Sequence, residues 1–514
     1  MIENIKINVV LGLPCTGKTT LSRKLAQALQ TEHISIGDLI RDYFLNNEVV
    51  KKEHFSAFEG KQVFDEQLII HLLNRALIEK TYDSVVIDAG PPFDKVVERM
   101  NLSINAVFFI HVSDQKRIEN FSEREQQGER YDDEIKLYNS RTALYKRELN
   151  KLYQYFDQKI GIYDLDGDGS KEVVLSQALS YMLLNNLENS EIYPNNVSAH
   201  IDLGDTEIGG IVNALIKTSK DFHKPTYYRT DNVINTQKGK TFSKNNMLLL
   251  FKPCLSYPQS VYRYVQRKLQ QHGYGIEGIV FWDKESVLKS GVFKAHFDLH
   301  YINAKWGDLV IPTENFEGKT IVSAYQYSKD ISLIDKVWND EKKKPANIKH
   351  SLWALDSEDE IIINGHIPSI IRDFEEESDY VIAFHICSKC ENSMDWRFMR
   401  EKFLGSTDPF VADSKSLRWE AASGNLQIIG DINFRNNAFH LSSGPFEGYR
   451  EIRVWFGDNY VQDLFEESYV RGVIDRPIEE THKLQSSLYQ MTQNIDSDSS
   501  MLESILESLK EKYN

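Results

Sequence analysis

Cysteine is scarce in this sequence, with four residues in a chain of 514. Secreted proteins that depend on disulfides use cysteine far more densely, so this usage indicates a reducing compartment. Apolar runs are also short: the longest, Ile104–Val112, falls well below the roughly 20 residues that span a bilayer. The first residues lack the charged-then-apolar pattern of a secretory leader. We therefore expect a soluble cytoplasmic protein with no membrane partner.

Positive charge is in deficit too. The chain carries 60 lysine and arginine residues against 76 aspartate and glutamate residues, a formal net charge of −16. Nucleic acids and anionic membranes both require a basic surface, so neither is expected as a general partner. A hydrophobic content of 41% is sufficient for packed cores and excludes extensive disorder.

The first 185 residues alternate between apolar runs and amphipathic stretches. The apolar runs are typical of parallel strands covered on both faces, and the stretches between them have helical period. This alternation predicts a doubly wound α/β domain over residues 1–185. The expected strands are Ile5–Leu11, Ser84–Asp88, Ala106–Val112 and Gly161–Leu165, and the expected helices are Lys18–Leu29, Asp65–Lys80, Gln115–Gln127 and Asp133–Gln158.

The composition changes after this domain. Residues 186–244 hold polar stretches and asparagine- and proline-containing turns, and we interpret them as a connector of unknown role. A second domain is expected over 245–478, with an exposed insertion loop near Asp340–Lys344. Residues 479–514 predict a tail helix. In the second domain we expect strands at Met247–Phe251, Ile276–Trp282 and Tyr380–Ile386, and helices at Ser260–Gln271 and Met394–Leu404.

A phosphate-binding loop follows the first expected strand. Residues 12–20 read Gly-Leu-Pro-Cys-Thr-Gly-Lys-Thr-Thr, which places G-x-x-x-x-G-K-T between a strand and a helix. Gly12 and Gly17 let backbone N–H groups approach phosphate oxygens, and the helix N-terminus adds a favourable dipole. We expect Lys18 on the β- and γ-phosphates of ATP, Thr19 on Mg²⁺ and Thr20 at the nucleotide.

Segments downstream of the loop resemble the nucleoside monophosphate kinase (adenylate kinase) family over about residues 4–180. They are His33–Arg41, Gly60–Glu66, Val86–Pro91, and Arg124 followed by Gly128–Asp133 and Arg141. The resemblance implies transfer of the γ-phosphoryl group of ATP to a nucleoside monophosphate. By the same resemblance, Arg41 would hold the acceptor phosphate, Asp88 would belong to the Mg²⁺ shell, and Arg124, Arg130 and Arg141 would bind the transferring group.

Several positions depart from this pattern. Pro92 and Asn120 stand where the family has phosphate-binding arginines, Val96 replaces the glutamine that reads adenine, and Ile36 replaces a threonine. ATP binding is expected to persist, whereas AMP as the acceptor is left open. The alternative is a kinase whose acceptor is a modified nucleotide or no nucleotide at all.

A second constellation lies around a histidine in the C-terminal half. Asn436–Gly444 and Tyr449–Phe456, with Gly405–Lys415 and Leu249–Pro253 upstream, resemble the nucleoside diphosphate kinase family over about 246–475. The resemblance implies a ferredoxin-like α+β domain, an insertion at about 302–365, and a homo-oligomer formed through this domain.

The chemistry implied by this resemblance is ping-pong transfer through a phosphohistidine. His440 would be the nucleophile, since a neutral imidazole attacks phosphorus readily near pH 7. Glu451 acting through Ser442 would fix its tautomer. The residues expected on the nucleotide are Lys252, Thr407, Arg418 and Asn437.

This half departs from its family as well. Glu401 occupies the place of a loop arginine, Leu441 replaces a glycine beside the histidine, and either His296-Phe297 or His300-Tyr301 corresponds to the usual His-Tyr pair. We therefore predict a bifunctional kinase that converts nucleoside monophosphates to diphosphates and diphosphates to triphosphates. The alternative of another class is a nucleotide-sensing scaffold in which one or both sites are inactive.

Overall fold

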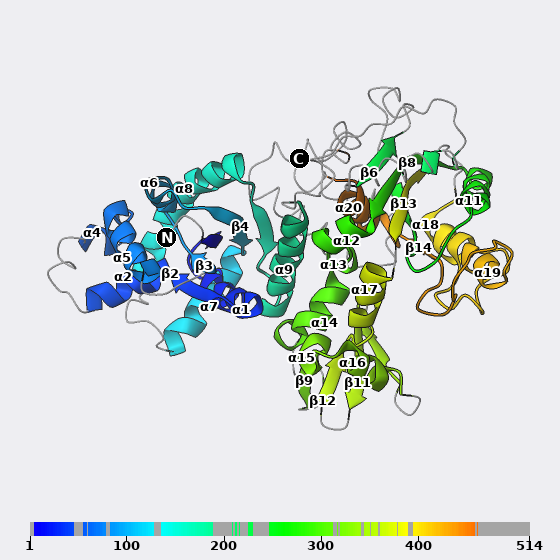
Figure 1. Cartoon of the computed structure of the whole chain (residues 1–514). Coiled ribbons are helices and arrows are strands. Elements are labelled where there is room, and N and C mark those ends of the chain that lie inside the picture. Colours follow the sequence, from blue (N-terminus) through cyan, green and yellow to red (C-terminus); the bar gives the residue numbers. More distant parts are fainter. Residues whose placement is uncertain are drawn as a thin grey trace. The chain divides into compact units, whose positions relative to one another are not determined.

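The computed structural model of the chain divides into two compact units, residues 1–182 with 306–317 and residues 183–305 with 318–514 (Figure 1). The residues that it describes are 5–45, 55–58, 60–78, 83–127, 135–188, 208, 211–212, 215, 225–229, 246–311, 316, 319–340, 344–349, 351–357, 360–377, 379–388, 394–457 and 460. Arg130 and the expected tail helix lie outside these residues. In the described part of the chain, no helix combines the length and the apolar character needed to cross a membrane.

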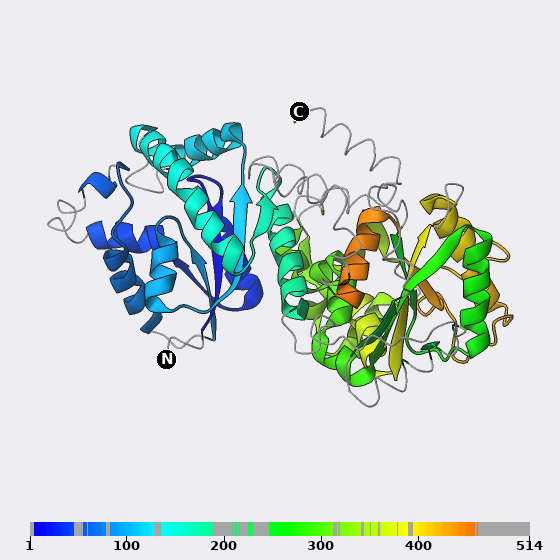
Figure 2. The same cartoon turned by 90° about the horizontal axis from the view of Figure 1, so that it is seen from above.

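The first unit is built on a sheet of five parallel strands in the order β2-β3-β1-β4-β5 (Figure 1, Figure 2). Side chains of successive residues in β1 are buried, because helices cover both faces of a parallel sheet. The strands are β1 (Lys6–Gly12), β2 (Glu32–Ser35), β3 (Ser84–Asp88), β4 (Ile104–His111) and β5 (Tyr163–Asp166). The helices are α1 (Lys18–Leu29), α2 (Ile36–Leu45), α4 (Phe55–Phe58), α5 (Glu66–Ile78), α6 (Phe93–Met100), α7 (Asp114–Gln127) and α8 (Ile135–Lys159), and α9 (Lys171–Glu188) begins in this unit.

This arrangement matches the expected parallel α/β architecture. It adds strand β2 and helices α2, α4, α6 and α9, which the pattern did not separate from loops. All five strands point the same way, so their carboxyl ends meet at one edge of the sheet, where ligands of such folds bind. Gly12 and Asp88 end two of the adjacent strands at that edge.

The second unit contains an antiparallel sheet in the order β14-β7-β13-β8-β6. Met247, Leu249 and Phe251 of β7 point into one hydrophobic cluster, and Leu248 and Leu250 point into another, as the two-residue period of a strand requires. The strands are β6 (Thr226–Arg229), β7 (Asn246–Phe251), β8 (Tyr274–Asp283), β13 (Tyr380–Ser388) and β14 (Phe439–Leu441). The helices around them are α11 (Gln259–Gln271), α12 (Lys284–Ser290), α13 (Val292–Phe297), α19 (Leu417–Ala422) and α20 (Pro445–Phe456), and α14 (Leu299–Val310) begins in this unit.

A smaller mixed sheet, β10-β11-β12-β9, lies in the segment expected as an insertion. Its own core is small and includes Trp338, Leu355 and Ile362. The elements are β9 (Thr320–Ser323), α15 (Ala324–Tyr327), α16 (Ile331–Trp338), β10 (Ala346–Lys349), β11 (Leu352–Ser357) and β12 (Glu360–Ile363), and α17 (Ile367–Glu376) follows. The segment therefore contains a folded subdomain. Residues 341–343 of the loop expected near Asp340–Lys344 lie outside the described residues.

Within the range 186–244, which we interpreted as a connector, strand β6 pairs with β8. One expectation needs revision. The helix expected over Met394–Leu404 is a short α-helix, α18 (Trp396–Phe398), that continues as a π-helix, η5 (Met399–Leu404).

Candidate active sites

The phosphate loop of the first unit has the backbone geometry that its glycines permit. Gly17 has φ of 84° and Gly12 has φ of 151°. A Cβ on Gly12 would lie 2.8 Å from the carbonyl oxygen of Ile110 and 2.8 Å from Oγ1 of Thr16, so only glycine fits. Lys18 Nζ donates to the carbonyl oxygens of Gly12 at 2.9 Å and Leu13 at 2.7 Å. The ammonium group is thus held over the loop, where phosphate would enter.

The loop opens into a cavity of about 1170 Å³. The expected site residues that line it are Gly17, Lys18, Thr19, Thr20, Arg41, Asp88, Arg124 and Arg141. Their side chains reach this cavity from the loop, from α2, from the end of β3 and from helices α7 and α8. Cationic side chains from separate elements therefore surround one space large enough for nucleotides.

Asp88 is buried and oriented by two neighbours from β2. Its Oδ2 lies 3.0 Å from Nε2 of His33, and its Oδ1 accepts a hydrogen bond from Oγ of Ser35 at 3.0 Å. Sequence reasoning missed both partners as site residues, although they stand in the segment that resembles the kinase family. The Asp88 carboxylate and the Thr19 hydroxyl line the same cavity, and such oxygen ligands suit Mg²⁺.

The residues that depart from the family pattern have other roles here. Asn120 Nδ2 donates to the carbonyl oxygen of Cys15 at 2.9 Å, so it supports the phosphate loop. Val96 and Pro92 are buried. Tyr145 lines the cavity. Burial raises the pKa of its phenol by more than the charges of Arg141 and Arg41 lower it. This wall therefore offers a neutral hydroxyl beside the two arginines.

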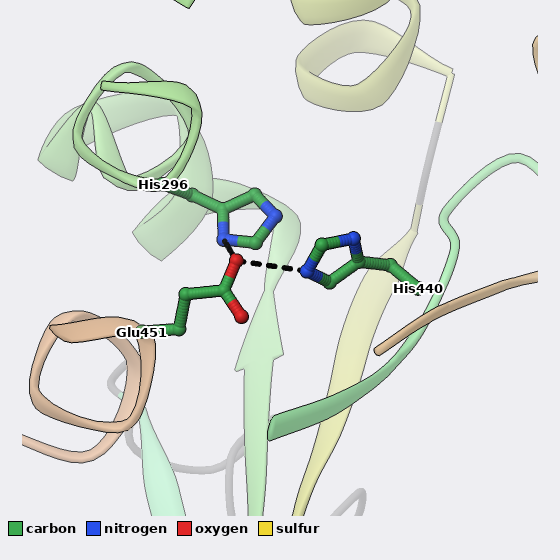
Figure 3. A group of neighbouring side chains, drawn as sticks. All are labelled: His296, His440 and Glu451. Atoms are coloured by element: carbon green, nitrogen blue, oxygen red, sulfur yellow. Dashed lines mark hydrogen bonds and ion pairs between the residues drawn. The ribbon is translucent and has the colours of Figure 1, made fainter. Parts of the chain in front are cut away.

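In the second unit, His440 and Glu451 contact each other directly (Figure 3). His440 Nε2 lies 2.8 Å from Oε1 of Glu451, and Ser442 Oγ donates to Oε2 of the same carboxylate at 2.6 Å. Glu451 therefore acts on the histidine without passing through Ser442, which corrects the expected relay. The carboxylate is buried, whereas 26% of the His440 side chain is exposed. The other ring nitrogen, Nδ1, points away from Glu451 (Figure 3).

His296 of α13 is brought to the same place. Its Nδ1 lies 3.4 Å from Oε1 of Glu451, and Trp455 Nε1 donates to that nitrogen at 3.3 Å. The rings of His296 and His440 are 4.8 Å apart and nearly perpendicular. Of the two histidine-aromatic pairs left open by the sequence, His296-Phe297 is the one whose histidine reaches His440.

Burial shifts the pKa values of His440, His296 and Glu451 toward their uncharged forms. Burial lowers the pKa of His440 to about 4 and that of His296 to about 3, and it raises the pKa of Glu451. A lowered pKa means that an imidazole stays neutral, with a lone pair available, at any pH well above that value. The imidazole of His440 therefore keeps its lone pair near neutral pH.

The pKa of His440 can be tested by its reactivity. We expect the rate of carbethoxylation of His440, followed by peptide mass spectrometry, to stay nearly constant from pH 7.5 down to about pH 5, because neutral imidazole is the reactive form and the pKa lies near 4. Histidines in water lose reactivity below about pH 6.5. N-acetylhistidine treated in parallel is the reference. A decline of His440 below about pH 6.5 that follows this reference would contradict the lowered pKa.

The expected nucleotide-binding residues of this unit lie around β14. They differ in how many of their polar atoms already bind other protein groups. Lys252 Nζ donates to the carbonyl oxygen of Arg435 at 3.0 Å, and burial lowers its pKa to about 7. Arg418 is buried, and it donates to the carbonyl oxygens of Phe439 at 3.0 and 3.1 Å and Gly405 at 3.1 Å, so it holds the backbone beside His440.

Asn437 has an atom available to a ligand. Its Nδ2 donates to the carbonyl oxygen of Thr407 at 2.7 Å, while its Oδ1 is buried and has no hydrogen-bond partner in the described part of the chain. A buried acceptor without a donor is costly unless a ligand supplies one. The Thr407 side chain is exposed, and Glu401 forms an exposed ion pair with Arg397.

The parallel sheet, the glycine-rich loop and the cationic cavity together are those of a phosphate-loop domain. Residues 11–138 match the family described as AAA domain. Adenylate kinase from Deinococcus radiodurans is 26% identical over 190 residues, which cover 34% of this chain and 96% of the relative. Adenylate kinase from a Mycobacterium species is 29% identical over 185 residues, covering 33% of this chain and 96% of the relative. Adenylate kinase isoenzyme 5 of Mus musculus is 26% identical over 226 residues, covering 42% of this chain and 39% of the relative. The N-terminal region is therefore similar to adenylate kinases.

Proposed function

We propose that the first unit transfers the γ-phosphoryl group of ATP to a nucleoside monophosphate. The observation that carries the proposal is the single cavity in which the phosphate loop, Asp88, Arg41, Arg124 and Arg141 meet. Similarity to enzymes named adenylate kinases supports the same reaction class.

We propose separate tasks for these groups. Lys18 and the loop amides would neutralise the donor phosphates, and Arg41 would hold the acceptor phosphate. Arg124 and Arg141 would offset the charge that spreads over the transferring group, since phosphoryl transfer depends mainly on positioning and electrostatic stabilisation. Asp88 and Thr19 would hold Mg²⁺, which neutralises the phosphate oxygens when bound.

We propose that the second unit transfers a phosphoryl group through His440. The lone pair of Nδ1 would attack the γ-phosphorus of a nucleoside triphosphate, forming a P–N bond as the bond to the bridging oxygen breaks and the diphosphate leaves. The proton on Nε2 stays in place, held by Glu451 at 2.8 Å. A second nucleoside diphosphate would then take the phosphoryl group and restore His440.

Three further observations support this second activity. The strands β14, β7, β13 and β8 lie in the order fourth, first, third, second, which agrees with a ferredoxin-like domain. Asn437 Oδ1 offers a buried acceptor to a sugar hydroxyl, and Lys252 lies one strand away from His440. The two activities would act in sequence, because the diphosphate made by the first unit is the substrate of the second.

The test measures phosphoryl transfer from ATP to a panel of acceptors. The full chain is incubated with ATP and Mg²⁺ and with each common nucleoside monophosphate and diphosphate separately, and the products are resolved by anion-exchange chromatography. Conversion of at least one monophosphate to its triphosphate supports both activities and names the base. Reaction of diphosphates alone would assign the first unit another acceptor, such as a modified nucleotide. Nucleotide binding without turnover would instead favour a sensing scaffold.

A further inference from the structure

Arg435 ties the loop before His440 to the inserted subdomain. The residue lies five positions before His440, between α19 and β14. Its Nη2 donates to Oδ1 of Asp335 at 2.7 Å, and its Nη1 lies 3.8 Å from Oδ2 of Asp373. Asp335 belongs to α16, inside the segment 302–365, and Asp373 belongs to α17. An aspartate 100 residues away in sequence thus binds the loop that leads into His440.

The Asp335 carboxylate is held in place by other hydrogen bonds besides the one from Arg435. Its Oδ1 also accepts hydrogen bonds from Ser369 Oγ at 3.1 Å and Asn339 Nδ2 at 3.0 Å. Partial burial raises the pKa of its carboxyl, but the bonds from Arg435, Ser369 and Asn339 outweigh this and lower it, so the group is ionised. Ser369 of α17 and Asn339 at the end of α16 therefore orient the carboxylate toward Arg435.

The backbone of Arg435 continues the link to the nucleotide-binding residues. Its carbonyl oxygen accepts the hydrogen bond from Lys252 Nζ, and its N–H donates to Oδ1 of Asn433 at 2.9 Å. The same Asn433 oxygen accepts from the N–H of Asn436 at 2.9 Å, and Asn437 follows directly. Residues 433–438 therefore form a compact turn that carries both a contact to Lys252 and the unpartnered Asn437 oxygen.

Helix α17 holds the other side of this arrangement. Cys254, two residues after Lys252, donates from Sγ to the carbonyl oxygen of Asp373 at 3.2 Å. The ammonium of Lys252 also lies 5.9 Å from the ring centre of Phe374. Asp335 and Asp373 consequently restrain the turn 433–438, while the helix that carries Asp373 restrains the segment after β7.

We propose that Asp335 is a positioning residue of the histidine site, through which the inserted subdomain holds the turn 433–438 in the conformation that binds nucleotide. The inference rests on the proposed phosphohistidine activity. A partly exposed ion pair contributes little to global stability, so the effect of losing it should appear in the population of the binding-competent turn. Apparent affinity falls in proportion to that population, and each factor of ten in Kd corresponds to 1.4 kcal/mol.

The experiment uses the full chain with Lys18→Ala, so that only the second unit transfers phosphate. His440 is labelled with ATP carrying a radioactive γ-phosphate, and the ATP concentration at half-saturation and the saturating rate are measured. We expect Asp335→Ala to raise the half-saturating concentration about tenfold, with the saturating rate within about twofold. Arg435→Gln should have the same effect, and the double variant should add nothing further, as for two residues that act through one contact.

Asp330→Ala is the matched control. Asp330 caps α16 by accepting a hydrogen bond from the N–H of Ser332, so its loss weakens the same helix without touching Arg435. Half-saturation should change less than about twofold in this variant. Unchanged half-saturation in Asp335→Ala, or an equal change in Asp330→Ala, would overturn the positioning role.

Amide hydrogen exchange in the ligand-free chain tests the restraint by Asp335 independently of the proposed phosphohistidine activity. Faster exchange over residues 433–438 in Asp335→Ala but not in Asp330→Ala supports the restraint by Asp335, whereas equal exchange overturns it. Absence of labelling in the parent chain would reject the proposed phosphohistidine activity. The exchange data would then decide the restraint separately.

Discussion

Replacement of Lys18 with alanine should lower the rate of nucleoside monophosphate phosphorylation by roughly 10³-fold, because a preorganised cation at the transferring phosphate is worth that much in such reactions. Lys18 Nζ already lies at the loop carbonyl oxygens of Gly12 and Leu13, so the charge needs no rearrangement to meet a phosphate. The loss should fall on the chemical step. Conversion of nucleoside diphosphates to triphosphates should remain within about twofold, since His440 belongs to the other unit.

A matched lysine shows whether charge in general is responsible. Lys159 lies on α8 of the same unit, is exposed and pairs with Glu98 at 2.9 Å. Exposed pairs of this kind contribute little, so Lys159→Ala should leave the monophosphate reaction within about twofold of the parent chain. Equal losses in both variants, or a Lys18→Ala protein that retains its full rate, would show that the loop is not the donor site.

Local patterns accounted for most of the first unit. The loop glycines and the apolar run before them fixed the ends of β1 and α1 to within a residue, because turn geometry, strand and helix all follow from neighbouring residues. Strand β2 was missed because its four residues are too few for a period to show. His33 was missed as a partner of Asp88 for a related reason: the two residues are 55 positions apart and meet only through strand pairing.

The second unit shows where sequence reasoning ends. Glu451 and Ser442 were expected near His440 from the family resemblance, but the direct contact between carboxylate and imidazole depends on how α20 packs against the sheet. The inserted subdomain had no local signal, since its strands β9, β10 and β12 have four residues each and its core is small. The contact between Asp335 and Arg435 spans 100 residues and follows from tertiary packing alone.

Substitution of His440 with asparagine should abolish phosphorylation of the protein and lower the conversion of diphosphates to triphosphates by at least about 10⁴-fold, because no other group replaces a missing nucleophile. Asparagine keeps the approximate size of the side chain, and His440 is partly exposed, so the fold should tolerate it. The monophosphate reaction should persist, and nucleoside diphosphate should accumulate as its final product. This accumulation is the distinguishing result, since a general loss of folding would reduce both reactions together.

The control for this variant is another histidine of the same unit. His272 ends α11 and contacts the rings of Phe398 and Phe403, away from Glu451. His272→Asn should keep phosphate labelling within about twofold, while Glu451→Gln should retain labelling at a rate reduced by roughly 10-fold to 10³-fold, because a neutral amide orients Nε2 but stabilises the developing imidazolium charge less. Full labelling in His440→Asn would place the acceptor on another residue. Loss of labelling in His272→Asn alone would also place the acceptor on another residue. If the labelling rate instead falls from His272→Asn to Glu451→Gln to His440→Asn, the phosphate is carried by the imidazole that the buried carboxylate orients.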